Sequence, residues 1–190
     1  MVLRQSRKTA ADKLQTRLKE ELAALDMPRA EFVCQFEAQT MAPNGMDEMR
    51  FLMTANIGEA LKPMSKVASG GELARIMLAI KNVMAERDLV GTLIFDEVDA
   101  GVSGRAAQKV AEKLRAVSSD KQVLCVTHLP QIAAAADIHL FIQKTEKNGR
   151  TFTQINRLNK QERAREIARI IGGAEITETT LRSAEEMLMG

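Results

Sequence analysis

The chain has 190 residues, 45% of them hydrophobic, and its 27 lysine and arginine residues nearly balance 25 aspartate and glutamate residues. This length and composition suit one globular core, and the near-neutral charge lacks the overall basic excess that is typical of a nucleic-acid binder. Tryptophan and tyrosine are absent and only six phenylalanines occur, which argues against a base-stacking surface.

Residues 1–25 are predicted to form one helix, whose apolar residues recur on a single face with Glu21 interrupting them. These apolar residues are Ala11, Leu14, Leu18 and Leu25. The stripe is shorter than the roughly three to four heptads that identify a coiled coil, so a surface helix and a coiled-coil stub both remain open. Arg4, Arg7 and Lys8 form a small basic cluster, which we interpret as a solvated face.

Two strands are predicted next. Pro28 ends the first helix because proline cannot continue it. Residues 31–39 alternate between apolar and polar side chains, and residues 49–56 return as a second strand after the turn signal at residues 43–45. This pattern predicts an antiparallel pair, followed by a loop over residues 57–66.

A capped helix is predicted to begin at Ser69. Ser69 precedes Glu72 by three residues, which is a capping-box spacing, and the helix is expected to run to about Arg87. Apolar residues recur along it at spacings of three and four, which predicts one buried face. They are Leu73, Ile76, Met77, Ile80 and Met84. Gly70 and Gly71 leave the first amides uncovered, so this end can bind an anion such as phosphate, although capping boxes without a ligand are common.

Residues 92–95 form a short apolar run that predicts a buried strand, and two carboxylates follow it directly. A parallel strand that ends in two acids is a Walker B arrangement. There Asp96 can hold magnesium and Glu97 can orient or deprotonate an attacking water. The alternative is a solvated turn that happens to contain two acids.

A second strand is expected over residues 122–126, after an acidic turn at residues 98–104 and a helix over 104–117. Strand, helix and strand in this order predict parallel pairing. His128 would then emerge at the same carboxyl end of the sheet as the two carboxylates, where ligands bind in open α/β sheets.

The remaining segment is predicted to contain a short helix, a hairpin and two amphipathic helices. Asn148-Gly149 is a strong turn signal between the two hairpin strands. The expected ranges are 130–135, 138–144, 150–158, 162–171 and 177–189.

The two cysteines, Cys34 and Cys125, lie far apart in the sequence and lack metal-ligand neighbours. We expect both to be buried free thiols of a reducing cytosol. No apolar run reaches the length of a membrane span and no signal peptide opens the chain, which again predicts a cytoplasmic protein without a membrane partner.

The motifs SGGE, LIFDE, DAGVS and VTH, in this order, resemble the ATPase heads of the ABC superfamily, with a signature loop, Walker B, D-loop and switch histidine. Three longer strings are similar to the RecN branch of the SMC-like DNA-repair ATPases: LKPMSKVASGGELARIMLAIK, TLIFDEVDAGVSGRAAQ and VTHLPQIAAAAD. Glu72 also stands where transporter subunits usually carry glutamine. The resemblance runs from about Phe51 to the C-terminus.

This resemblance implies an α/β fold, the C-terminal lobe of an ABC/SMC-type ATPase head, in which a P-loop NTPase-like sheet has flanking helices and a coiled-coil stub precedes it. Residues 1–27 would be the stub and residues 28–190 the half-head. ATP and Mg²⁺ are the implied cofactors. The implied roles are catalysis by Glu97 and His128, magnesium binding by Asp96, and nucleotide binding across a dimer by Ser69, Gly70, Gly71, Glu72 and Asp99.

The sequence contains no G-x-x-x-x-G-K-[ST] loop to cradle phosphates. The implied partners are therefore an N-terminal half of the same head, which would carry that loop, and a second head in an ATP-sandwiched dimer. The complete protein would bind DNA and repair double-strand breaks in a bacterial cytoplasm, near the nucleoid, and this chain alone is expected to be inactive. Alternatives are a chromosome-organising SMC head, an ABC transporter subunit, or a docking module without catalysis.

Overall fold

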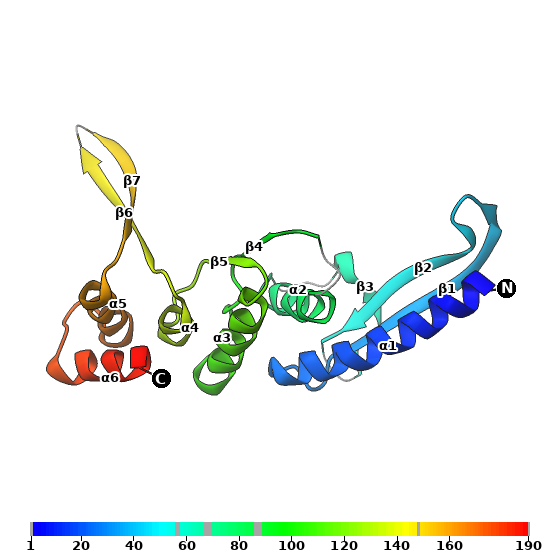
Figure 1. Ribbon diagram of the computed structural model, residues 1–190, viewed down its shortest axis with the longest axis horizontal. Helices are drawn as coiled ribbons and strands as arrows, with labels where there is room; N and C mark the ends of the chain where they lie inside the picture. The colour runs from blue at the N-terminus through cyan, green and yellow to red at the C-terminus, as the bar shows by residue number, and fades with distance from the viewer. Residues whose placement is uncertain (1, 56–57, 67–69, 86–88, 148, 190) are drawn as a thin grey trace. The chain divides into compact units, whose positions relative to one another are not determined.

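The computed structural model (Figure 1) describes residues 2–55, 58–66, 70–85, 89–147 and 149–189. The chain divides into two compact units, Met1–Val126 and Thr127–Gly190. None of the described helices combines the length and the apolar character that crossing a lipid bilayer requires.

The first unit begins with helix α1 (Val2–Ala24), which lies beside a long antiparallel hairpin (Figure 1). Strands β1 (Glu31–Ala42) and β2 (Gly45–Thr54) form this hairpin, in the predicted antiparallel arrangement. Gly45 has a φ of 102°, a left-handed conformation that glycine adopts without steric cost. Where a loop was predicted, a short strand β3 (Lys62–Pro63) pairs with β2, and the 3₁₀ turn η1 (Met64–Lys66) follows it.

The start of α1 holds the tip of this hairpin. Arg4 Nε lies 3.2 Å from a carboxylate oxygen of Asp47, which is buried, and Arg7 Nη2 donates to the carbonyl of Asn44 at 2.8 Å. Arg4 and Lys8 are exposed, as predicted for a solvated face, and Arg7 is half-buried. Both guanidinium groups bind partners that lie about 40 residues away, which a local pattern cannot reveal.

The core of the first unit lies where α1 packs against α2 (Gly70–Met84), and α2 packs against α3 (Gly104–Ser118). Each helix contributes side chains that are fully or almost fully buried. They include Leu18, Leu22, Leu25, Ile76, Leu78, Val110 and Val117. Of the predicted face, Ala11, Leu18 and Leu25, which directly follows α1, are buried and Leu14 is half-buried. Leu22 is buried as well.

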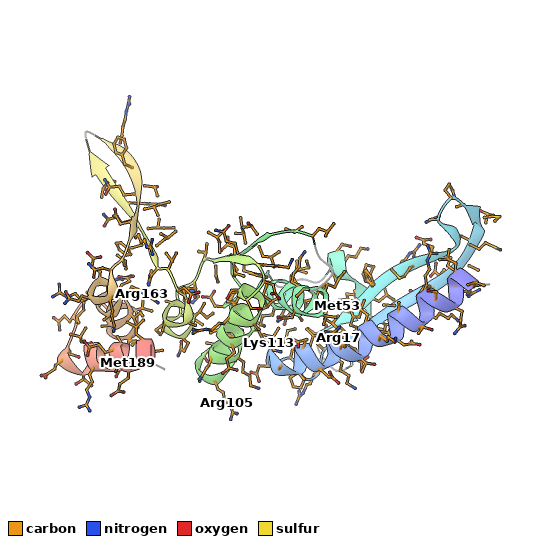
Figure 2. The ribbon with its side chains drawn as sticks, in the orientation of Figure 1. Arg17, Met53, Arg105, Lys113, Arg163 and Met189 are labelled. Atoms are coloured by element: carbon orange, nitrogen blue, oxygen red, sulfur yellow. The ribbon has the colours of Figure 1, made fainter. Side chains whose placement is uncertain are left out.

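Glu21, the acid that interrupts the apolar stripe of α1, has a partner on α3. Lys113, labelled in Figure 2, places its Nζ 2.8 Å from both carboxylate oxygens of Glu21. This ion pair fastens α1 to the rest of its unit. The continuation of α1 as a coiled coil, and the predicted division at residues 27–28, stay predictions.

Strands β4 (Thr92–Phe95) and β5 (Gln122–Cys125) pair in parallel, with α3 between them in the chain. The predicted parallel arrangement is confirmed. Within this unit one face of the pair is exposed: Ile94 is 73% exposed, and Leu124 and Val126 are exposed as well. Parallel sheets in folded domains are normally covered on both faces, so an exposed apolar face on β4 and β5 is unusual.

The second unit consists of α4 (Pro130–Ala135), α5 (Lys160–Gly172) and α6 (Glu178–Met189), packed around a small core of Ala133, Ile167, Ala168 and Ala184. The antiparallel hairpin of β6 (Leu140–Lys147) and β7 (Arg150–Arg157) extends away from these helices (Figure 1). All the elements predicted for this region form, with small shifts at their ends.

Two sets of hydrogen bonds hold α5 in this unit. Asn159 caps it, because its side chain accepts from the amides of Gln161 and Glu162 while the Glu162 carboxylate accepts from the Asn159 amide. Arg163, labelled in Figure 2, donates to backbone carbonyls at the end of α4, including that of Ala136. These bonds satisfy backbone groups at two helix ends.

Candidate functional site

Helix α2 begins at Gly70 and ends at Met84. Ser69, the predicted cap, and Arg87, the predicted end, lie outside the described residues, so the capping box stays a prediction. Gly71 is buried and Glu72 is half-buried in the first turn. The helix start therefore combines two residues without side chains and one acid.

The buried face of α2 differs from the predicted one. Of the five predicted apolar residues only Ile76 is buried. The buried face consists of Gly71, Arg75, Ile76, Leu78 and Ala79. At Gly71 this face packs closely against a neighbouring turn, whereas Leu73 and Met77 line an open groove of about 350 Å³ between α2 and β4. Asp96 borders the same groove.

The neighbouring turn follows β4 and carries the predicted acids. Asp96 and Glu97 are both exposed, and Asp99 is only 2% exposed. The amide of Ala100 donates to the carbonyl of Glu97 at 3.0 Å, which closes the turn. Glu97 has a φ of 56°, a left-handed conformation that costs a non-glycine residue about 1–2 kcal/mol. The turn therefore holds Glu97 in an unusual backbone conformation, as is common at functional sites.

The two glycines of α2 lie directly against this turn. A methyl group added to Gly70 would lie 2.7 Å from Oε2 of Glu97. A methyl group added to Gly71 would lie 2.5 Å from the carbonyl oxygen of Ala100 and 2.7 Å from its Cβ. The structure thus brings Gly70, Gly71 and Glu97 together, and the absence of side chains at the two glycines is what permits it.

Arg75 is a residue of this site that the sequence reasoning missed. It is 8% exposed, and its Nη1 donates to the carbonyl of Ala100 at 2.8 Å. Burial lowers the pKa of Arg75, and the nearby charges of Glu72 and Asp26 oppose that shift. Sequence spacing could have identified Arg75, because it follows Gly71 by four residues and therefore lies on the same face of the helix.

Asp96 is the predicted magnesium ligand, and the number and type of ligands near it decide whether Mg²⁺ could bind there. Among the described residues no group of three or more His, Cys, Asp or Glu side chains is arranged to hold a metal ion. The described part of the chain would then supply at most two such ligands, of which Asp96 is the predicted one. Such a donor set fits Mg²⁺, which usually takes one or two carboxylates and fills its other positions with phosphate oxygens and water.

His128 belongs to the second unit and is exposed. It follows the end of β5 by three residues, and the hydroxyl of its neighbour Thr127 accepts from the amide of Leu129 at 3.0 Å. The functional roles of His128, Asp96, Glu97 and Asp99 stay predictions.

Cys125, at the end of β5, is expected to react slowly with alkylating reagents. Burial, with smaller contributions from the charges of Asp99 and Asp96, raises the pKa of Cys125 to about 12. A raised pKa favours the neutral thiol, so at pH 9 only about one Cys125 in a thousand would be the reactive thiolate, against about three quarters of an unperturbed thiol. Iodoacetamide should label the folded chain at least about a hundredfold more slowly than the chain in urea.

This experiment needs a variant in which Cys125 is the only cysteine that iodoacetamide can label. Cys34, the other free cysteine, is buried and also has a raised pKa, mainly through burial, so Cys34→Ser removes its signal. Mass spectrometry of the Cys125 peptide then measures labelling between pH 8 and pH 11. Equal rates in the folded and unfolded chains would contradict the raised pKa.

No family model matches the chain. The chain is 48% identical to the DNA repair protein RecN of Bacillus subtilis over 97% of its own length, and 42% identical to the DNA repair protein RecN of Vibrio cholerae over 98%. It spans about a third of the length of these curated relatives, 35% and 34% respectively.

Solved structures of SMC heads are similar in fold. An Smc head domain with a coiled coil and joint from Pyrococcus yayanosii gives a TM-score of 0.58 at 19% identity, over 85% of this chain and 29% of that chain. A chain from work on ATP-driven dimerization and DNA-stimulated activation of SMC ATPases gives a TM-score of 0.53 at 20% identity, over 89% of this chain and 96% of that chain. The predicted α/β fold of an SMC-type head is confirmed.

Proposed function

We propose that this chain, which belongs to the RecN family of DNA repair proteins over the third of their length that it spans, forms the C-terminal half of an SMC-like ATPase head. The complete protein would bind and hydrolyse ATP between two heads during recombinational repair of DNA double-strand breaks. The observation that carries the proposal is the contact of the two α2 glycines with the turn that carries Glu97. This contact would join an anion-binding helix start to a carboxylate that activates water.

The two acids after β4 would have different roles, one in metal binding and one in proton transfer. Asp96, which is exposed beside the groove, would hold Mg²⁺ through a carboxylate oxygen or a bound water. The ion would neutralise charge on the phosphates. Glu97 would accept the proton of the attacking water, and its constrained backbone limits the directions in which the carboxylate can point. His128 would contact the γ-phosphate and help to fix that water.

The start of α2 would serve the nucleotide of a second head. Ser69, Gly70, Gly71 and Glu72 would bind its γ-phosphate through uncovered amides and the helix dipole. Asp99 would lie in the loop that crosses to that head. ATP would therefore hold the two heads together, and a single head could not complete either site.

The other half of the head would cover the exposed face of β4 and β5. That face presents Ile94, Leu124 and Val126, apolar side chains that a parallel sheet normally buries. The same half would supply the phosphate-cradling loop that this sequence lacks. The complete protein would act in the bacterial cytoplasm, at the nucleoid, with DNA and not a membrane as its partner.

The RecN relatives favour this function over the alternatives of a chromosome-organising SMC head or an ABC transporter subunit. Glu72 also favours it over the transporter, because transporter subunits usually carry glutamine there. A docking module without catalysis has less support, because both Asp96 and Glu97 are present and accessible.

The proposal is tested by measuring ATP hydrolysis of this chain alone and after mixing with the separately expressed remainder of the protein. We expect no turnover by the chain alone and Mg²⁺-dependent turnover by the mixture. Hydrolysis by the chain alone would refute a split head. If the two parts associate but remain inactive, the docking module becomes the better account.

A further inference from the structure

Arg75 carries a charge that is buried in the interior of the first unit. Its side chain is 8% exposed, and burial lowers its pKa. Among the described residues its Nε finds no hydrogen-bond partner, and the bond from Nη1 to the carbonyl of Ala100 is its specific contact. Burying a guanidinium is costly unless its charge is paired and its donors are hydrogen-bonded, so the single specific contact of Arg75 calls for an explanation.

That bond fixes the middle of the turn that carries Glu97. The amide of Ala100 donates to the carbonyl of Glu97, and the carbonyl of Ala100 accepts from Arg75. The same carbonyl lies against Gly71 at the start of α2. Arg75 stands one helical turn after Gly71, so its guanidinium holds the turn against the helix start from the buried side.

We infer that Arg75 is a positioning residue that couples the phosphate-binding start of α2 to the turn that orients Glu97. When the helix start moves onto a phosphate, the turn must move with it, since the hydrogen bond and the close packing at Gly71 join the two segments. The catalytic consequence rests on the proposed function, whereas the coupling itself is a property of this chain. Arginine suits the task because its planar donors reach a carbonyl in a fixed direction.

Amide hydrogen exchange of this chain without nucleotide tests the coupling. In Arg75→Gln, the amides of Ala100 and Val102, which both donate within the turn, should exchange about tenfold faster. Amides of the β6–β7 hairpin should not change. Arg17→Gln, on the exposed Arg17 of α1 labelled in Figure 2, is the matched control and should leave both regions unchanged.

Two results would overturn the inference. Unchanged exchange at Ala100 and Val102 would show that the bond does not hold the turn. An equal increase throughout the chain would show that Arg75 only stabilises the fold.

Kinetics of the reassembled protein test the catalytic consequence. Arg75→Gln should lower kcat about tenfold while KM for ATP stays within about twofold, and Arg75→Lys should restore part of kcat. An unchanged kcat, or a rise in KM alone, would refute positioning of Glu97. If the unsubstituted mixture does not hydrolyse ATP, the proposed function fails, and the exchange rates still decide whether Arg75 couples the two segments.

Discussion

Replacing Glu97 with glutamine is expected to lower ATP turnover of the reassembled protein at least about a hundredfold, because an amide cannot take the proton of the attacking water. Glutamine has nearly the same shape, so the backbone bond from Ala100 to residue 97 should persist. Nucleotide binding should persist as well. Steady-state phosphate release measures the loss of turnover. ATP-dependent co-elution of two heads measures the nucleotide binding that remains.

Glu112→Gln is the matched control for this experiment. Glu112 is an exposed acid on α3 in the same unit, so the identical chemical change there should leave turnover unaffected. If Glu97→Gln kept more than half of the activity, Glu97 could not be the water-activating carboxylate.

Replacing Gly71 with alanine is expected to lower the free energy of unfolding by about 1–3 kcal/mol, the usual cost of overpacking a close contact. The added methyl group would meet the backbone carbonyl and the Cβ of Ala100, and neither can move without shifting the turn. Urea denaturation of the chain measures the change, provided that the slope of the transition stays the same.

Two other glycines give controls for this effect. Gly91→Ala meets nothing within 4 Å and should leave stability unchanged or slightly raised. Gly70→Ala meets only the end of the flexible Glu97 side chain, so it should cost less than Gly71→Ala. Equal stability of the Gly71 and Gly91 variants would show that α2 does not pack tightly on the turn.

Local signals predicted much of the fold. The Pro-Asn-Gly turn located the β1–β2 hairpin, Asn148-Gly149 located β6–β7, and the apolar run before Asp96 located β4. Each depends on residues that are adjacent in sequence, where backbone preferences act directly. The motif order then brought Gly70, Gly71 and Glu97 to attention as candidates for one site.

The position of Arg75 could not be predicted in the same way. Apolar periodicity assigns the buried face to the largest hydrophobic residues, which on α2 gave Leu73 and Met77. Close approach of the turn instead requires Gly71 on the buried face, and it places an arginine there whose Nη1 donates to the carbonyl of Ala100. Such a partner, 25 residues along the chain, leaves no local signal.

The ion pair of Glu21 and Lys113 illustrates the same limit at longer range. Its two residues are 92 positions apart, and in the sequence Glu21 only breaks an apolar stripe. The partner becomes apparent once α3 is placed in the same unit as α1.

The parallel pairing of β4 and β5 is expected to form more slowly than the two antiparallel hairpins of the chain. Both hairpins join strands that are neighbours in the chain, and such hairpins form within about 1–10 μs. Thr92 pairs with Gln122, so β4 and β5 can meet only after the intervening chain, including α3, has closed on itself, which is a slower event. Asp96 and Glu97 extend from β4, so they are expected to take their final places after the two hairpins have formed.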